Sequence, residues 1–162
     1  MKVLMPPELL QDDKYKRRVF LAGSIEMGKA ELWQDQIIKF AETPEARNYY
    51  HSNNTLFYNP RRADWDSTWK QDITDGNFYR QVSWELTALE RSTHILYYFA
   101  PNTMSPISLL ELGKFSSYPD KKIVVVASPE YARKGNVDVF CERYRIGQAG
   151  DLIQGFKYLM VM

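Results

Sequence analysis

A single carboxylate stands inside an apolar stretch near the middle of the chain. Glu111 belongs to SPISLLELGKF, residues 105–115, with Ile107 four positions before it and Phe115 four after it. At helical spacing these residues share one face, and leucines cover the other side, so the pattern predicts a helix buried all round. The serine–proline pair at the start of the stretch marks the first turn of this helix. Glu111 lies deeper than that turn, so it does more than complement the helix dipole, and its burial favours a chemical role.

A second glutamate lies at the edge of another apolar stripe. Glu85 follows Val82 by three residues and precedes Leu89 by four. Two carboxylates whose burial holds their pKa values apart suit a nucleophile and an acid or base acting at the anomeric carbon of a sugar. The structural alternative for Glu85 is an ion pair with a nearby arginine or lysine.

The elements that would position these glutamates alternate along the chain. Nearly continuous apolar runs rich in β-branched and aromatic residues predict strands at 19–23, 55–60, 93–100 and 122–128. Helical spacing predicts helices at 29–42, 78–92 and 105–118, with one or two more within 136–144 and 152–160. A helix after each strand makes successive right-handed crossovers. The sequence therefore predicts a single α/β domain with a doubly wound parallel sheet of four or five strands.

Ligands of open α/β sheets bind beyond the carboxyl ends of the strands, so the loops there are candidate binding elements. Gly23 closes the first predicted strand, and the loop after it offers backbone freedom and NH groups ahead of a helix, which suits an anion or a hydroxyl group. The loop at 59–77 is long enough to be a substrate lid. In it Arg61 could bind a phosphate and Trp65 could stack on a base. A solvated arginine and a core aromatic residue are the alternatives.

Composition excludes several classes of partner. With 21 basic and 20 acidic side chains the formal net charge is +1, so the overall charge recruits neither a nucleic-acid polymer nor a membrane surface. No apolar run is long enough to span a bilayer, the first residues lack signal-peptide features, and Cys141 is a lone cysteine, so we expect a cytoplasmic protein. His51 and His94 have no metal-ligand spacing around them, so we expect no metal and no cofactor.

Four segments resemble one known family. They are VFLAGSIEMGKAELW, FYNPRRADWD, QVSWELTALERSTHILYYF and SPISLLELGKF. In this order and spacing they resemble the nucleoside 2-deoxyribosyltransferase-like family, which includes related deoxynucleoside monophosphate N-glycosidases, over roughly residues 18–146. The resemblance implies a flavodoxin-like fold with Glu111 as the nucleophile that holds deoxyribose as a covalent ester. It also implies that Glu85 protonates or positions the leaving base.

The resemblance extends to binding residues. The opening GSIEMGK resembles the GSIRGG-type loop of the glycosidases, which implies that Gly23 and Ser24 contact substrate. Asn136 matches an asparagine that reaches into a neighbouring subunit's site, which implies a homo-oligomer. Ser105 stands where the transferases carry an aspartate, and with Ser108 nearby the loss of that charge would better tolerate a 5′-phosphate.

These observations predict an enzyme that cleaves or transfers the N-glycosidic bond of 2′-deoxynucleosides or their monophosphates. A small nucleoside or nucleotide would be its partner. Two alternatives stay open: a non-catalytic nucleotide-binding or sensing module, and an NAD-type glycohydrolase that uses the same glutamate.

Overall fold

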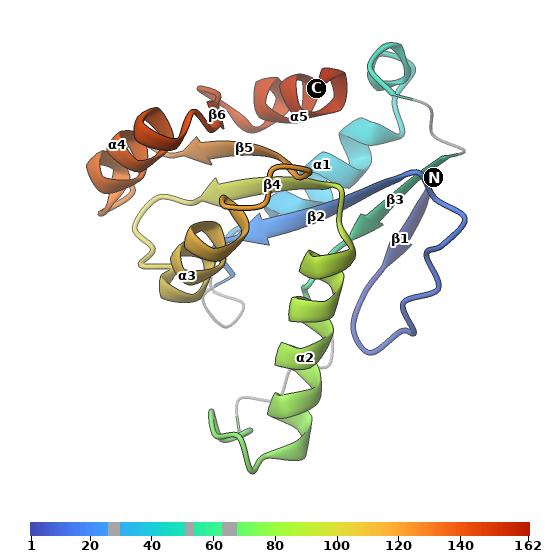
Figure 1. Ribbon diagram of the computed structural model, residues 1–162, viewed down its shortest axis with the longest axis vertical. Helices are drawn as coiled ribbons and strands as arrows, with labels where there is room; N and C mark the ends of the chain where they lie inside the picture. The colour runs from blue at the N-terminus through green and yellow to red at the C-terminus, as the bar shows by residue number, and fades with distance from the viewer. Residues whose placement is uncertain (26–29, 51–53, 63–67) are drawn as a thin grey trace.

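A six-stranded parallel sheet forms the centre of the computed structural model, which describes residues 1–25, 30–50, 54–62 and 68–162 (Figure 1). The strands are β1 (Lys2–Leu4), β2 (Arg17–Gly23), β3 (Thr55–Tyr58), β4 (His94–Phe99), β5 (Lys122–Ala127) and β6 (Gly147–Gln148). Their order across the sheet is β1-β3-β2-β4-β5-β6. Without the edge strand β1, this is the 2-1-3-4-5 order of flavodoxin-like folds, so the predicted fold class is confirmed.

The number of strands is higher than the four or five predicted. The four central strands lie where the apolar runs placed them, and β1 and β6 are added at the two edges. β1 has three residues and β6 has two, so neither is long enough to show a strand-like pattern in the sequence. Pairing with β3 and β5 gives them their strand conformation.

Helices cover both faces of the sheet (Figure 1). They are α1 (Trp33–Ala41), α2 (Gly76–Arg91), α3 (Pro106–Phe115), α4 (Lys134–Tyr144) and α5 (Leu152–Val161), with a 3-10 turn η2 (Ala46–Asn48). One buried cluster joins α2, α3 and α4 to the sheet, and the other joins α1 and α5 to its opposite face. Successive strand residues therefore face different layers: Tyr97 of β4 packs in the first cluster, and Tyr98 packs against the second.

The helix that contains Glu111 differs from its prediction in two respects. It is not buried all round, because Ile107 is 61% exposed and Leu110 is 70% exposed, while Ser108 and Glu111 lie on the buried face. Ser105 is the N-cap residue, but its side chain makes no capping hydrogen bond. Ser105 has a left-handed backbone, with φ of 46°. Its hydroxyl makes a hydrogen bond with the hydroxyl of Ser24 instead.

Candidate active site

The strand order of the sheet reverses between β2 and β4, and the carboxyl ends of these two strands are where the topology predicts a ligand site. Gly23 ends β2 beside Tyr98 in β4. Its φ is +143°, and a Cβ atom there would lie 2.1 Å from the carbonyl oxygen of Tyr98. Only glycine fits this close approach, because any side chain would overlap the neighbouring strand. Gly23 thus allows the close approach of the two strands at their carboxyl ends.

A cluster of three hydroxyl groups joins the end of β2 to the loop before α3. Ser24 Oγ lies 2.8 Å from Thr103 Oγ1 and 2.6 Å from Ser105 Oγ, and it accepts a hydrogen bond from the backbone NH of Ala100 at 2.9 Å. All three hydroxyl-bearing residues are buried. The cluster stabilises the left-handed backbone of Ser105 and so fixes where α3 begins. Direct contact of Ser24 or Ser105 with substrate stays a prediction.

Glu111 presents an unpaired carboxylate on the buried face of α3. Its side chain is 8% exposed, and within the described ranges its carboxylate makes no hydrogen bond and no ion pair. Burial raises its pKa to about 8, and the nearby charge of Glu85 adds to the rise. A buried carboxylate without a partner destabilises a fold, so its retention calls for a chemical explanation.

Glu85 lies on α2, which packs on the same side of the sheet as α3. Its side chain keeps part of its accessible surface, yet protein atoms crowd the carboxylate. Burial raises its pKa to about 7, and a hydrogen bond from Gln81 Nε2 to Glu85 Oε1, at 2.6 Å, acts in the opposite direction. This neutral contact replaces the ion pair that was the structural alternative: in the described residues Glu85 has no basic partner.

An electrostatic interaction links the two glutamates. Each has a raised pKa, and the charge on Glu85 disfavours ionisation of Glu111. Such a pair holds one proton near neutral pH, because two adjacent buried carboxylates resist carrying two charges. One member is then ionised and the other protonated, and the higher pKa of Glu111 leaves the proton on Glu111 in the unliganded protein.

Two further polar residues belong to this site, and the sequence analysis missed both. Gln81 donates to the carbonyl of Pro60 at 3.2 Å as well as to Glu85, and its buried Oε1 has no partner in the part of the chain that is described. The buried hydroxyl of Tyr97 likewise has none. The spacing of Gln81 four residues before Glu85 was a usable helical signal. The ring of Tyr97 packs in the core.

Arg61 is a buried clamp at the end of β3. Its Nε donates to Gln34 Oε1 at 2.7 Å, and its Nη2 donates to the carbonyls of Ala30, at 3.0 Å, and Glu31. It thereby ties the loop after β3 to the segment that leads into α1. It is not the solvated surface arginine of the structural alternative, and phosphate binding stays a prediction. Trp65 lies outside the described residues.

The remaining predicted residues lie on different sides of α3. Ser108 is buried on the same helix face as Glu111, and in the described residues its hydroxyl makes no hydrogen bond. Asn136 is exposed near the start of α4. It lines a small apolar groove of about 160 Å³ between α3 and α4. This position leaves Asn136 available to another subunit, and oligomerisation itself stays a prediction.

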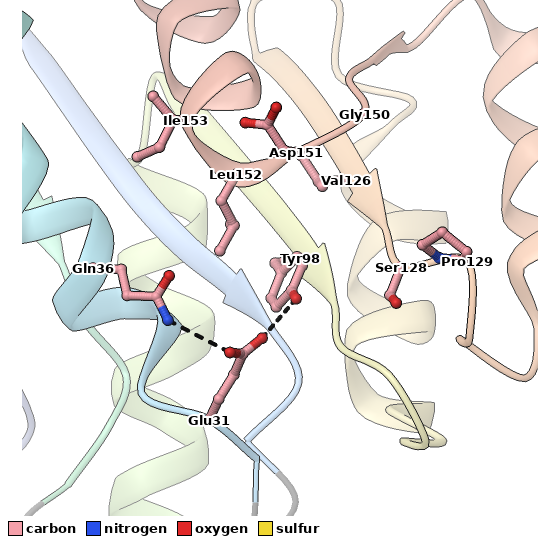
Figure 2. Close-up of a pocket in the computed structure, with 10 residues that line it drawn as sticks. All are labelled: Glu31, Gln36, Tyr98, Val126, Ser128, Pro129, Gly150, Asp151, Leu152 and Ile153. Atoms are coloured by element: carbon pink, nitrogen blue, oxygen red, sulfur yellow. Dashed lines mark hydrogen bonds between the residues drawn. The ribbon is translucent and has the colours of Figure 1, made fainter.

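A separate cavity of about 330 Å³ opens on the other face of the sheet (Figure 2). It lies between α1, β4 and the start of α5, and it contains neither Glu85 nor Glu111. At its floor Tyr98 Oη donates to Glu31 Oε1 at 2.6 Å, and Gln36 Nε2 donates to the other carboxylate oxygen at 3.5 Å (Figure 2). The carboxylate pair and this cavity are thus distinct features.

The family of proteins described as nucleoside 2-deoxyribosyltransferase-like matches residues 16–131, more than two thirds of the chain. The chain belongs to this family. The matched region contains the carboxyl ends of β2 and β4, the hydroxyl cluster and both glutamates, whereas Asn136 follows it. No curated protein matches this chain.

Family membership agrees with a site that acts on small nucleoside-type molecules. Across the described ranges, no helix is both long and apolar enough to cross a bilayer. The same residues contain no group of three or more histidine, cysteine, aspartate or glutamate side chains placed to bind a metal ion.

Proposed function

We propose that this protein cleaves or transfers the N-glycosidic bond of 2′-deoxynucleosides or their 5′-monophosphates through a covalent glycosyl ester on Glu111. The observation that carries the proposal is the buried, unpaired carboxylate of Glu111 coupled to a second buried carboxylate, Glu85. Membership of the nucleoside 2-deoxyribosyltransferase-like family supports glycosyl transfer on nucleosides.

In the first step Glu111 passes its proton to Glu85, a carboxylate oxygen of Glu111 attacks C1′ of the sugar, and the bond between C1′ and the base nitrogen breaks. The bonding electrons leave with the base, which takes the proton from Glu85. A glycosyl ester and a neutral free base result. Positive charge develops on the sugar ring in the transition state, and the Glu111 anion stabilises it.

In the second step an acceptor attacks C1′ and the ester bond breaks, which returns Glu111 to its carboxylate form. A nitrogen of another base or a water molecule serves as acceptor, and Glu85 takes up its proton. The chemistry uses only carboxylates, so it requires no metal and no cofactor. The acceptor decides between transferase and hydrolase.

The other predicted residues would bind the sugar and its 5′ end. The backbone at Gly23 lies at the carboxyl end of β2, and the unpaired hydroxyl of Ser108 lies one helical turn from Glu111 on the same face. Ser108 would donate a hydrogen bond to a 5′-hydroxyl or a 5′-phosphate. An aspartate at position 105 would repel such a phosphate, whereas Ser105 carries no charge. Asn136 of a second subunit would complete the site in a homo-oligomer.

The decisive experiment is chromatographic and includes a matched control. Wild type, Glu111→Gln and Glu90→Gln are incubated with deoxynucleosides, deoxynucleoside monophosphates and NAD, with and without a free base. Glu90 is an exposed glutamate on α2, so the control changes the same chemical group outside the site. We expect base release or exchange by wild type and the control only, with a glycosyl adduct on Glu111 in intact-mass spectra.

The outcomes separate the alternatives. Products that form only with a free base indicate a transferase, and base release in water indicates a hydrolase. Turnover of NAD alone would favour the glycohydrolase. If wild type binds nucleotides in a thermal-shift assay and releases no base, the binding-module alternative replaces this proposal.

A further inference from the structure

We infer that Gln81 is the positioning residue for Glu85. Its side-chain amide, anchored on the carbonyl of Pro60, donates to one carboxylate oxygen of Glu85 and keeps the negative charge of the carboxylate pair there in the unliganded protein. This inference rests on the proposed function, because it says which glutamate accepts the first proton. It is testable without turnover.

The side-chain amide of Gln81 has only one orientation. Its Nε2 donates to the carbonyl oxygen of Pro60 at 3.2 Å and to Glu85 Oε1 at 2.6 Å. An amide nitrogen carries two hydrogens, so these two bonds use both of them. A flipped amide would bring its oxygen against the carbonyl oxygen of Pro60, which can only accept. The nitrogen therefore has to face Glu85.

The carbonyl that anchors the amide belongs to a firmly held segment. Pro60 is buried just after β3, between Asn59 and Arg61. The backbone NH of Asn59 donates to the carbonyl of Leu4 at 3.0 Å, and Asn59 Oδ1 accepts from the backbone NH of Arg61 at 3.1 Å. The side chain of Arg61 is fixed in turn by its hydrogen bond to Gln34. The Pro60 carbonyl is therefore a fixed point from which an amide can be oriented.

A glutamine at position 81 carries a cost in stability. The side chain is 3% exposed, and in the described residues its Oε1 has no hydrogen-bond partner. A buried acceptor without a partner is destabilising, and a methionine of similar shape would avoid that penalty. Methionine, however, cannot donate a hydrogen bond. The two bonds from Nε2 are what the amide supplies at this position.

The bond to Glu85 decides where the charge of the pair lies. A hydrogen bond donated to a carboxylate favours its ionised form, so Gln81 opposes the burial that raises the pKa of Glu85 to about 7. Glu111 has no such donor in the described residues, and burial, with the charge on Glu85, raises its pKa to about 8. Glu85 is therefore the ionised member and Glu111 the protonated one.

The other titratable groups around the pair do not change this assignment. Glu111 on α3 interacts electrostatically with Glu85, and no arginine or lysine of the described ranges contributes to the pKa of Glu85. Tyr97 on β4 interacts with Glu111, and burial raises its pKa well above the ordinary value, so it stays neutral. Gln81 is thus the polar side chain that favours the ionised form of Glu85.

This arrangement provides a base for the first step of the proposed reaction. Glu111 must lose its proton before it attacks C1′, and Glu85 can take that proton only while it is ionised. With Oε1 engaged by Gln81, Oε2 is the oxygen positioned to take the proton and to give it to the leaving base. At a pH below the pKa of Glu85 both glutamates are protonated and this transfer stops. Gln81 thus sets the lower pH limit of activity.

The test is Gln81→Met, which keeps the length of the side chain and removes the donor. In ¹³C NMR titrations of the unliganded, glutamate-labelled protein, with Glu85→Gln used for assignment, the pKa of Glu85 should rise by about one unit, since a hydrogen bond to a charged group is lost. The acidic limb of the kcat/KM profile should move to higher pH by the same amount. Activity should therefore fall about tenfold at about pH 6, and the loss should shrink as the pH rises.

Gln36→Met is the matched control. Gln36 Nε2 also donates to a glutamate, Glu31, at 3.5 Å, in the cavity on the other face of the sheet. Its replacement should leave the Glu85 titration and the pH profile unchanged. If Gln81→Met loses activity equally at every pH and its Glu85 titrates as in wild type, Gln81 has a structural role only and the inference is wrong.

A measurement on wild type covers the case in which Gln81→Met does not fold. The side-chain NH₂ resonances of Gln81 should shift with pH at the midpoint of the Glu85 titration, because one of the two hydrogens lies on that carboxylate. Resonances that stay constant between about pH 5 and pH 9 would overturn the inference. A wild type without turnover whose Glu85 titration still depends on Gln81 would refute the proposed function alone.

Discussion

The two faces of strand β4 differ in how their polar groups are used. On the face toward α1 and α5, the cavity of about 330 Å³ is lined by groups that satisfy one another: Tyr98 and Gln36 both donate to Glu31. On the face toward α2 and α3, Glu111, Tyr97 and the oxygen of Gln81 lack partners in the described residues. In the described residues the buried Nε2 of Gln34 on α1 also lacks a partner, so unused hydrogen-bonding capacity is concentrated on the face toward α2 and α3 and is not confined to it.

Of the variants that test this comparison, Glu111→Gln should have the largest effect on kcat. It removes the nucleophilic charge and keeps the side-chain shape, so we expect kcat to fall at least about a thousandfold. The measurement is base release, followed by chromatography, with Glu90→Gln as control. Activity within tenfold of wild type would mean that the buried carboxylate is not the nucleophile.

Glu85→Gln should have the next largest effect. Without its proton the leaving base departs as an anion, so kcat should fall by about a hundredfold or more. A substrate whose base needs no protonation should lose much less, because the missing step is proton transfer. Equal losses for both substrates would assign Glu85 a role in packing or binding.

The carboxylate pair should also make stability depend on pH. Burial raises the pKa of Glu111 from 4.5 to about 8, so the folded state binds more protons than the unfolded state between these values. The stabilisation is complete below the lower value and is lost as the pH rises through about 8. Wild type should therefore lose on the order of 3 kcal/mol between about pH 6 and pH 9.

Urea unfolding of wild type and Glu111→Gln at several pH values checks this prediction. The variant should have a flatter profile and should exceed wild type in stability at the alkaline end. Parallel profiles would show that Glu111 is ionised at no cost in the folded protein, which contradicts its burial without a partner.

The smallest effect is expected on the cavity face. Tyr98→Phe breaks the hydrogen bond to Glu31, so the free energy of unfolding should fall by about 1 kcal/mol or less. Turnover should stay within about twofold of wild type, since tenfold already corresponds to about 1.4 kcal/mol of transition-state stabilisation. A loss of kcat as large as that in Glu85→Gln would remove the distinction between the two faces.

Periodicity along the chain was enough to predict the central architecture. The runs at β2, β3, β4 and β5 are apolar because both faces of a parallel sheet are covered, and the intervening segments have helical spacing. Glu111 was recognisable because a carboxylate within an apolar helical pattern is exceptional. The edge strands β1 and β6 could not be recognised, since a segment of two or three residues is too short to show an alternation of apolar and polar side chains.

Three features of the site depended on contacts between distant segments. The hydroxyl of Ser105 could equally cap α3, and its bond to Ser24 exists because β2 and β4 are neighbours in the sheet. Arg61 became a buried clamp because the segment before α1 folds over it. Helical spacing showed that α3 has apolar residues on all sides. Only packing decided that Ile107 faces outward and Glu111 faces inward.

By itself, then, the sequence determined the fold class, the family and the identity of the unusual carboxylate, because these depend on local pattern and composition. Tertiary structure decided which polar groups share an environment: Glu85 on α2 and Glu111 on α3 lie near enough for the charge of one to raise the pKa of the other. The physical reason is that pKa shifts and hydrogen-bond partners arise from burial and proximity in space. Neither can be read from spacing along the chain.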